Sequence, residues 1–332
     1  MIRVSDYHHR FRCLAGACPH SCCEQWQVVL DEDTAARYRR VEGELGARLR
    51  AAMEDVDGEV SFPLRGGRCP FLNGENLCEI HISLGEDATS LTCRSHPRFT
   101  EEYEGLREVT LAVSCPAANA LLFSSDAPLR FVEEDDGETP LADPLFALRE
   151  ELFRLLYADA PLKDRLRALL TLGWAGQCLA DEGEDDALYT LRYEDVLPVE
   201  IPDGPPLFPA ALDALSELEI LGSDWAALLR RAKDLPPWDG TSNAPALTRL
   251  CAYYLFRYVC KAMGDGDILG KIQLAVLAVL TAAHLAPETG VAEAARLFSR
   301  EIEHSEENLE RLAEDFCFDP RLGPERFFTS LK

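Results

Sequence analysis

The sequence lacks any apolar run long enough to cross a membrane. Its longest apolar stretch, residues 274–286, contains a histidine and falls short of the roughly 20 residues that a transmembrane helix needs. Residues 1–12 read MIRVSDYHHRFR, with charges and histidines where a secretory signal carries about 7 to 15 apolar residues. We therefore expect a cytoplasmic protein with no membrane partner.

Basic residues are scarce relative to acidic ones. The chain has 33 Lys and Arg against 58 Asp and Glu, which gives a formal net charge of −25. Such a charge repels phosphate backbones and argues against nucleic acid as a partner. The excess is uneven, because residues 1–128 account for only −7 of it.

Several familiar site motifs are absent as well. No Gly-rich dinucleotide fingerprint follows a strand pattern, and residues 264–271 lack the glycine and the Ser or Thr that a phosphate-binding loop requires. The C-x3-C-x2-C signature of radical enzymes that use S-adenosylmethionine is missing, because Cys18-x3-Cys22 is followed at once by Cys23. These absences exclude the common nucleotide and radical-enzyme motifs.

Cysteine, by contrast, is abundant and clustered. Eight of the 12 cysteines fall within the first 115 residues: Cys13, Cys18, Cys22, Cys23, Cys69, Cys78, Cys93 and Cys115. A chain in a reducing cytoplasm does not keep four disulfides, so these thiols are better explained as ligands for a soft metal. A small domain with little regular structure also needs such a source of stability.

The spacing favours an iron-sulfur cluster, with 4Fe-4S as the first choice and zinc as the alternative. A Cys-x2-Cys zinc knuckle is absent, whereas a cluster accepts wider and less regular spacings because its inorganic core fixes the geometry. Eight thiols exceed the needs of one site, so either two sites exist or some thiols are not ligands. The vicinal pair Cys22 and Cys23 should diverge, and one of the two is expected to bind.

The other cysteines are interpreted as structural. Cys251 and Cys260 fall on opposite faces of one expected helix and cannot bind one metal together. Cys178 and Cys317 lie among apolar helical residues and are expected in the core, as is His284.

The fold class predicted is mainly α, with a small cysteine-rich domain of loops and short strands packed with an all-helical domain. We expect the cysteine domain at residues 1–130, an acidic linker at 131–142 and the helical domain at 143–332. Asp143-Pro144 predicts a helix start. Apolar periodicity predicts further helices in a bundle or irregular array, at 162–170, 209–219, 224–233, 244–263, 267–285 and 291–316.

The first domain should hold one long helix and one strand. Tyr38, Val41, Leu45, Leu49 and Met53 form one stripe, which predicts an amphipathic helix over 34–53. Alternating apolar residues at 109–113 predict a strand leading to Cys115, after a turn at 104–105.

Taken together, the cysteines and their neighbours resemble the flagellin lysine-N-methylase family and, more widely, small CxxCC-type zinc- or iron-chelating domains. The resemblance covers about residues 7–125 and departs from the family pattern in two places: Gln25 stands where glycine usually precedes Trp26, and His96 stands in place of tyrosine. The segments that carry it are Cys13–Trp26, Arg68–Leu72, Leu77-Cys78, Thr92–Arg98 and Ser114-Cys115-Pro116.

The resemblance implies a bacterial enzyme that transfers a methyl group from S-adenosylmethionine to surface lysines of flagellin, a protein substrate, and carries a cysteine-bound iron-sulfur cluster. Arg94 and Arg98 are candidates for compensating cluster charge or binding a cofactor carboxylate. Tyr103, His96, Glu101 and Glu102 are candidates for the base that deprotonates lysine. The alternative function is a non-catalytic metal- or cluster-binding module for sensing, storage or assembly.

Overall fold

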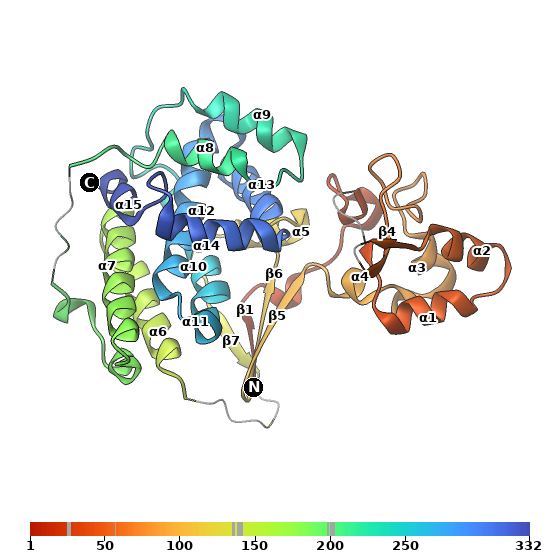
Figure 1. The fold of residues 1–332 in the computed structure, drawn as a ribbon, viewed down its shortest axis with the longest axis horizontal. Coiled ribbons are helices and arrows are strands. Elements are labelled where there is room, and N and C mark those ends of the chain that lie inside the picture. The colour runs from red at the N-terminus through yellow and green to blue at the C-terminus, as the bar shows by residue number, and fades with distance from the viewer. Residues whose placement is uncertain (25–27, 57, 135–136, 138–141, 198, 200–202) are drawn as a thin grey trace. The chain divides into compact units, whose positions relative to one another are not determined.

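The computed structural model describes residues 1–24, 28–56, 58–134, 137, 142–197, 199 and 203–332. These residues form two compact units, each described here by itself (Figure 1). The helical unit comprises Met1–His9, Thr100–Ser114 and Asn119–Lys332, and the cysteine unit comprises Arg10–Phe99 and Cys115–Ala118.

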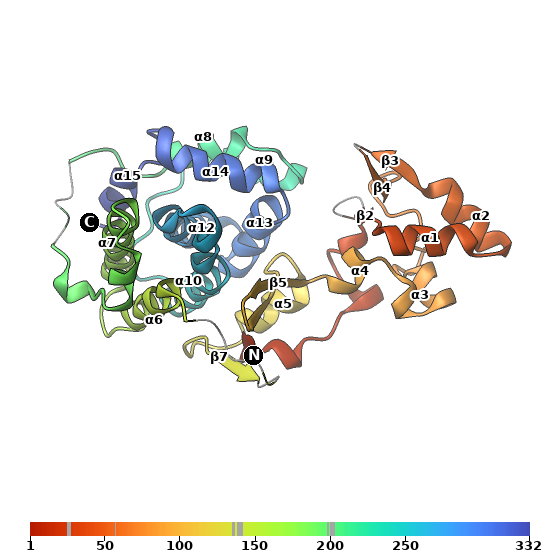
Figure 2. The same ribbon diagram turned by 60° about the horizontal axis from the view of Figure 1, so that its bottom comes forward.

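The helical unit is built around α12 (Ile268–Thr289). This helix contacts α7, α10, α13 and α14, and Figures 1 and 2 show it enclosed by them. Asp267 caps its start by accepting a 2.8 Å hydrogen bond from the backbone N–H of Gly270. Within the described residues it is the one helix with the length and mean hydropathy, 1.8, of a membrane span, but 89% of that segment is buried inside the unit. Its apolar surface therefore forms the core.

Most predicted helices of this unit are confirmed, and the fold is mainly α as expected. Asp143 accepts a 2.8 Å hydrogen bond from the N–H of Leu145, as the Asp-Pro helix start requires. The other helices are α5 (Pro116–Leu122), whose first three residues belong to the cysteine unit, α6 (Pro144–Leu156), α7 (Leu162–Asp181), α8 (Ala210–Glu217), α9 (Ser223–Ala232), α10 (Ala244–Tyr258), α11 (Ala262–Asp265), α13 (Val291–Glu303), α14 (Glu306–Phe318) and α15 (Pro324–Ser330).

The single helix expected at 291–316 is in fact two. The hydroxyl of Ser305 accepts a hydrogen bond from the N–H of Asn308 and caps α14. The Asn308 amide also donates a 2.7 Å hydrogen bond to the carbonyl of Glu301, near the end of α13. Capping side chains that compete with the backbone break the helix although the apolar pattern continues across the break.

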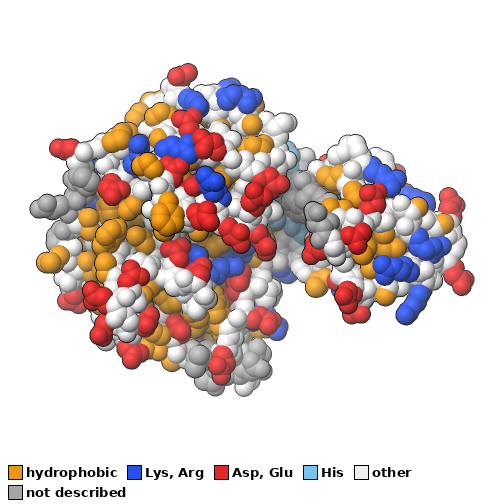
Figure 3. All heavy atoms as spheres, viewed as in Figure 1, with side chains coloured by type: hydrophobic (Ala, Val, Ile, Leu, Met, Phe, Trp, Pro, Cys, Tyr) orange, Lys and Arg blue, Asp and Glu red, His pale blue; other side chains and the backbone are white. Residues whose placement is uncertain are grey.

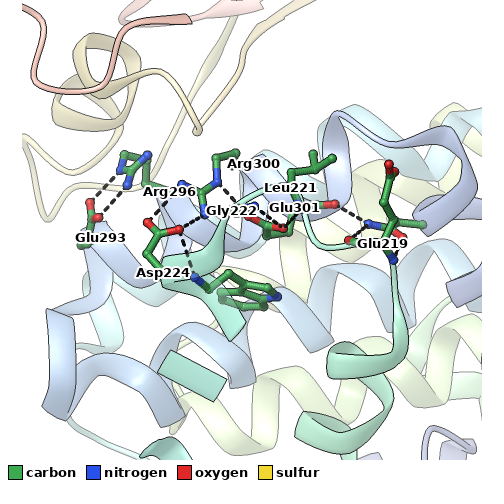
Figure 4. Close-up of polar contacts among 10 residues, drawn as sticks. Glu219, Leu221, Gly222, Asp224, Glu293, Arg296, Arg300 and Glu301 are labelled. Atoms are coloured by element: carbon green, nitrogen blue, oxygen red, sulfur yellow. Dashed lines mark hydrogen bonds and ion pairs between the residues drawn. The ribbon is translucent and has the colours of Figure 1, made fainter. Parts of the chain in front are cut away.

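A polar network ties α13 to α9 and the segment before it (Figure 4). The Arg300 guanidinium donates to Asp224 at 2.5 Å and to Glu301 at 2.8 Å, and Glu301 also accepts a 2.7 Å hydrogen bond from the N–H of Leu221. Burial raises the pKa of Glu301, while the Arg300 charge and these hydrogen bonds oppose that rise.

A four-stranded sheet also belongs to the helical unit. Its strands all come from residues before the expected helical domain at 143–332, whose described residues form helices and no strand, as predicted. The strand order is β5-β6-β1-β7, with β1 parallel to β6 and antiparallel to β7. The hairpin turn at Gly105 and the strand before Cys115 are confirmed. The strands are β1 (Ile2–Ser5), β5 (Arg98–Tyr103), β6 (Leu106–Leu111) and β7 (Phe131–Glu134).

The compact units thus differ from the predicted domain boundaries. Residues 1–9 and 100–114 were assigned to the cysteine domain, but strand pairing places them in the helical unit. Residues 131–134 of the expected linker form β7, which pairs with β1 over Ile2–Ser5. Residues 135–136 and 138–141 of that linker lie outside the described residues. Sequence order could not reveal these pairings, because they join segments far apart in the chain.

The cysteine unit has a small sheet, β2-β4-β3, and four short helices around an aromatic core. Tyr38 stacks on Phe62 with ring centroids 5.8 Å apart, and Phe62 contacts Phe71 at 4.8 Å. The Tyr38 hydroxyl donates a 2.8 Å hydrogen bond to the carbonyl of Ala88. The elements are β2 (Val28–Val29), α1 (Glu32–Arg40), α2 (Gly43–Ala52), β3 (Glu54–Val56), β4 (Glu59–Phe62), α3 (Glu79–Leu84) and α4 (Leu91–Ser95).

The helix expected at 34–53 is also broken, into α1 and α2. Val41 is extended, Gly43 has φ +76°, and a Cβ at Gly46 would lie 1.8 Å from the carbonyl oxygen of Val41. Arg50 donates a 2.7 Å hydrogen bond to that same carbonyl. The glycines therefore permit a tight turn between two helices that share one apolar stripe.

Candidate metal centre

All eight N-terminal cysteines lie in the cysteine unit. Residues 10–99 supply seven of them, and the segment Cys115–Ala118 contributes the eighth although its flanking residues belong to the helical unit. All 12 cysteines of the chain are described, and none forms a disulfide. One compact unit thus concentrates eight free thiols.

Four of these thiols, which we call the inner set, are Cys23, Cys69, Cys78 and Cys93. The N–H of Cys69 donates a 2.7 Å hydrogen bond to the carbonyl of Cys23, which joins the two halves of the motif. A backbone bridge pairs Leu72 with Cys78, and Cys23, Cys69 and Cys78 pack in the same apolar core. Ser90 caps α4 by accepting a 3.2 Å hydrogen bond from the N–H of Cys93.

Electrostatics show that the inner thiols lie near one another. Burial raises the pKa of Cys69 to about 12; the N–H of Phe71 opposes this rise, and the charges of Cys23, Cys93 and Cys78 add to it. Burial likewise raises the pKa of Cys93 to about 11, and it raises the pKa of Cys78. In both cases the charges of neighbouring thiolates raise the pKa further. Four thiolates so close together repel one another, and a bound metal cation would remove that penalty.

The remaining four thiols, Cys13, Cys18, Cys22 and Cys115, form the outer set. Burial raises the pKa of Cys115, and the charges of Cys18 and Cys13 raise it further. A hydrogen bond between Cys22 and Cys23 raises the pKa of Cys22 and lowers that of Cys23 to about 7. Since the charge of Cys13 also raises the pKa of Cys22, this vicinal pair lies between the two sets.

Backbone N–H groups point at several of the sulfurs. The N–H of Ala15 donates to the sulfur of Cys13 at 3.4 Å. Cys78 precedes α3 and Cys115 precedes α5. Burial raises the pKa of both thiols, and backbone N–H groups oppose the rise: those of Ile80 and His81 for Cys78, and those of Ala117 and Ala118 for Cys115. Donors placed this way stabilise thiolates and tune thiolate-bound metals, so the residues present fit a soft metal or cluster.

The thiols are not arranged as a finished coordination site. Across the part of the chain that the structure describes, no three His, Cys, Asp or Glu side chains already surround a common metal position. Metal binding would therefore require the cysteine side chains to rotate, as in proteins where metal binding and folding are coupled.

The predicted arginines have other partners. The Arg94 guanidinium donates to the carbonyls of Thr89 at 2.6 Å and Asp87 at 3.0 Å, so it holds the loop before α4. Arg98 lies over the Phe11 ring, 5.4 Å from its centroid. Burial, with the nearby Arg98 charge, lowers the pKa of His96 to about 4, which keeps its imidazole neutral at pH 7.

Three of the four candidate bases do not belong to the cysteine unit. Tyr103, Glu101 and Glu102 lie on β5 in the helical unit. Glu101 pairs with Lys261 at 2.5 Å and Glu102 with Arg107 at 3.0 Å. Burial raises the pKa of Tyr103, which keeps its hydroxyl protonated at pH 7. His96 is the one of the four that lies in the cysteine unit.

An arginine-lined pocket beside Cys69 is a feature that the sequence does not predict. Its volume is about 430 Å³, and its lining includes Arg48, Arg65, Arg68, Cys69 and Phe71. Arg68 pairs with Glu24, and Arg48 pairs with Glu79 at 2.5 Å. Figure 3 shows basic side chains gathered on the visible face of this unit. The Arg68-Cys69 dipeptide was the available signal, but nothing in the sequence linked it to Arg48 or Arg65.

The four cysteines after residue 115 differ in their burial. Cys251 and Cys260 are buried as expected, whereas Cys178 and Cys317 are exposed, so their expected core positions are wrong. Each lies on the outer face of a helix whose opposite side packs inward. His284 is buried as predicted and shares a 3.0 Å hydrogen bond with the carbonyl of Ala232 through Nε2.

Comparisons with known proteins agree with this geometry. A family model named CxxCxxCC, described as "Putative zinc- or iron-chelating domain", matches residues 12–116. The chain is 27% identical over 157 residues to "Lysine-N-methylase" of Salmonella typhimurium, which covers 44% of this chain and 38% of the relative. It is 29% identical over 124 residues to "Flagellar biosynthetic protein FliU" of Salmonella muenchen, covering 34% of this chain and 72% of the relative.

The chain spans about two fifths of the length of the curated lysine-N-methylases that it matches. No solved structure matches it. Gln25 and Trp26 of the resemblance lie outside the described residues. The cysteine pattern, the family model and these relatives agree: residues 12–116 match the CxxCxxCC domain, and the chain is similar to proteins named lysine-N-methylase.

Proposed function

We propose that this protein is an S-adenosylmethionine-dependent protein-lysine N-methyltransferase whose cysteine unit holds a metal centre. The observation that carries the proposal is the overlap between the eight clustered thiols and the segment matched by the zinc- or iron-chelating family model. Kinship with proteins named lysine-N-methylase supports the reaction type, and the flagellar relative supports flagellin as the protein substrate. Free thiols in such number suit the reducing cytoplasm.

The reaction makes a simple demand on the protein. The bond between the sulfonium sulfur and its methyl carbon breaks with both electrons left on sulfur, while the lysine nitrogen forms the new bond to that carbon. Lysine, with a pKa near about 10.4, must lose a proton first. His96 is our candidate to accept that proton, since its half-buried imidazole is neutral at pH 7 and lies three positions after Cys93 in the sequence.

We assign the inner set, Cys23, Cys69, Cys78 and Cys93, as the principal ligands. The hydrogen bond between the Cys69 and Cys23 backbones and their shared core support this choice. The outer set would hold a second site or shield the first. An iron-sulfur cluster is the favoured occupant, with zinc as the alternative; a cluster supplies redox-active iron, whereas zinc supplies a redox-inert centre.

The arginine-lined pocket is a candidate for the cosubstrate carboxylate. Arg65 pairs with Glu54 at 3.6 Å and has a 59% exposed side chain, so its guanidinium is available to a second anion. A carboxylate in this pocket would sit beside Cys69. Arg94, which donates to two carbonyls, and Arg98, which lies over Phe11, serve this role less well.

The test is methyl transfer by anaerobically purified protein from radiolabelled S-adenosylmethionine to flagellin. We expect label on flagellin lysines, loss of labelling in Cys69→Ser, and at least an approximately hundredfold slower transfer in His96→Ala, as for removal of a general base. Cys317→Ser is the matched control and should keep full activity, since Cys317 is exposed in the helical unit. A metal-loaded protein that labels no flagellin would contradict the methylase assignment.

The second candidate is a non-catalytic metal-binding module. It is favoured by one observation: the family model that matches residues 12–116 describes a zinc- or iron-chelating domain. Calorimetric titration of metal-loaded protein with S-adenosylmethionine separates the two. Binding that weakens in Arg65→Gln supports the enzyme, and no heat of binding supports the module.

A further inference from the structure

The helical unit contains a cavity of its own, and none of its lining residues is a cysteine. Its volume is about 400 Å³, within the range of about 300 to 1,000 Å³ typical of small-molecule sites. The lining comes from the start of α7, the segments before α8 and after α9, α12 and the C-terminal residues. The residues that matter most here are Lys163, Phe208, Lys233, Trp238, Leu280, His284 and Lys332.

The charge of this cavity is opposite to that of the protein. The chain has only five lysines, and three of them, Lys163, Lys233 and Lys332, line the cavity. No Asp or Glu belongs to the lining, although the chain carries 58 of them. A cationic lining in so acidic a protein selects for an anionic ligand.

The three lysines differ in their ion pairs. Lys233 pairs with Asp213, and Lys332 pairs with Asp203 at 3.0 Å. Lys163 makes no ion pair or hydrogen bond with any residue in the described ranges. Its methylene chain lies across Gly240, where a Cβ would meet Lys163 Cε at 2.7 Å. Because Gly240 has no side chain, the Lys163 side chain can pass over it. The Lys163 ammonium is then available to a ligand.

The floor of the cavity is flat and apolar. Phe208 stacks on His284 with ring centroids 4.4 Å apart and an interplanar angle of 2°. Leu280 is 4% exposed and His284 is 3% exposed, so this floor is part of the packed core. Trp238 is fixed by the 3.0 Å hydrogen bond that its indole N–H donates to the carbonyl of Ser242. A planar ring would find stacking partners here.

Hydrogen bonds hold the walls in place. The N–H of Leu207 donates to Ser330 Oγ at 2.7 Å, and Arg167 of α7 donates to the carbonyl of Leu331 at 3.0 Å. His284 of α12 bonds the carbonyl of Ala232 at the end of α9. The cavity is thus built by contacts that do not involve a ligand, which lowers the entropic cost of binding.

From these observations we propose that the cavity of the helical unit binds a small organic anion with a planar ring, its phosphate or carboxylate held by Lys163 and Lys233 and its ring lying against Phe208 and Trp238. This proposal does not depend on methyl transfer. The ligand expected here is an anion, whereas the sulfonium centre of S-adenosylmethionine is a cation.

Calorimetry on the full chain with four probes tests the site. Adenosine monophosphate carries a ring and a phosphate, benzoate carries a ring and a carboxylate, adenosine lacks the charge, and inorganic phosphate lacks the ring. We expect at least one of the first two to bind about tenfold or more tightly than both adenosine and inorganic phosphate. Which of the two binds better identifies the combination of ring and anionic group that the cavity prefers.

Two double variants, one inside the cavity and one outside it as the control, test the role of the lysines. Lys163→Gln with Lys233→Gln should weaken binding about tenfold or more, the loss expected for charge-assisted hydrogen bonds. Lys261→Gln with Lys271→Gln removes the same charge outside the cavity, where these lysines pair with Glu101 and Asp265, and should change affinity less than about twofold. Failure of both ring-bearing anions to bind, or equal losses in the two double variants, would overturn the proposal.

Discussion

The backbone N–H of Cys69 donates a 2.7 Å hydrogen bond to the carbonyl of Cys23. This contact joins the cysteine-rich N-terminal loop to the segment that carries Cys69 and Cys78. It explains how two groups of thiols separated by two helices and a hairpin come to share one core.

Replacing Cys69 by serine should remove the metal. Cys69 is buried among the inner thiols, and a hydroxyl is a poor ligand for a soft metal. We expect metal content per chain to fall at least about tenfold and the cysteine unit to unfold at lower temperature, because metal binding contributes to folding. Elemental analysis and thermal denaturation measure the two effects.

The comparison for that variant is Cys317→Ser, at an exposed position of α14. It should leave both metal content and melting temperature unchanged. Equal metal content in the two variants would remove Cys69 from the ligand set.

Replacing Arg149 by methionine should destabilise the helical unit strongly. The Arg149 guanidinium donates to Glu108 at 2.5 and 2.7 Å, and the two side chains are 1% and 3% exposed. The variant leaves the Glu108 charge buried with Arg3 as its remaining partner. Breaking such a pair typically costs about 3 to 5 kcal/mol. Denaturant unfolding measures the loss.

Arg107→Met is the control for Arg149→Met. Its partner Glu102 lies in the same sheet region, but both side chains are more than half exposed. Exposed pairs contribute about 1 kcal/mol or less. Similar losses in the two variants would show that burial does not determine the strength of the Arg149 pair.

Stability should fall as the pH drops below about 6.5, in part because of His284. Burial lowers the pKa of His284 below its ordinary value of 6.5, while the Ala232 carbonyl opposes that shift. The unfolded chain therefore takes up a proton at a higher pH than the folded one does. The stability that the neutral imidazole contributes is complete above 6.5 and is lost as the pH falls toward the lowered value.

The measurement is the free energy of unfolding of wild type and His284→Gln from pH 7.5 to pH 5. Glutamine keeps a donor for the Ala232 carbonyl but does not titrate. The gap between the two proteins should change with pH below about 6.5, to the disadvantage of wild type. A gap that stays constant would contradict a lowered pKa at this position.

Adding a methyl group at Gly46 should destabilise the cysteine unit. A Cβ there would lie 1.8 Å from the carbonyl oxygen of Val41, a position fixed by the turn between α1 and α2. Gly46→Ala should cost at least about 1 to 3 kcal/mol, as for other overpacked sites. Gly74→Ala is the control, because nothing lies within 4 Å of its Cβ position. Unfolding experiments that found equal stability in the two variants would argue against the tight turn.

Much of the helical unit could be predicted from sequence, because each helix carries local signals. The Asp143 cap, the apolar stripes of α7 and α12 and the turn at Gly105 all lie within a few residues of the element they define. The predictions that failed depended on distant contacts. β1 joins the helical unit by pairing with β6 and β7, and no local pattern in residues 1–9 shows these partners.

For the candidate site, the sequence predicted which segment carries the thiols but not how they are grouped in space. The order and spacing of the cysteines predicted the segment that carries the candidate metal centre, and all eight thiols do lie in one unit. The division into inner and outer sets was not accessible, because it depends on the Cys69–Cys23 contact across the fold. The roles expected of Arg94 and Tyr103 came from nearness in sequence to Cys93, which says little about partners in space.

The most direct test of the metal centre is elemental and acid-labile sulfide analysis of anaerobically purified protein, with the absorption spectrum recorded on the same sample. The account predicts at least one metal per chain, with iron, sulfide and a visible absorption band for a cluster or zinc and no colour for the alternative. A folded protein free of metal, with all eight thiols reactive or oxidised in pairs, would contradict it.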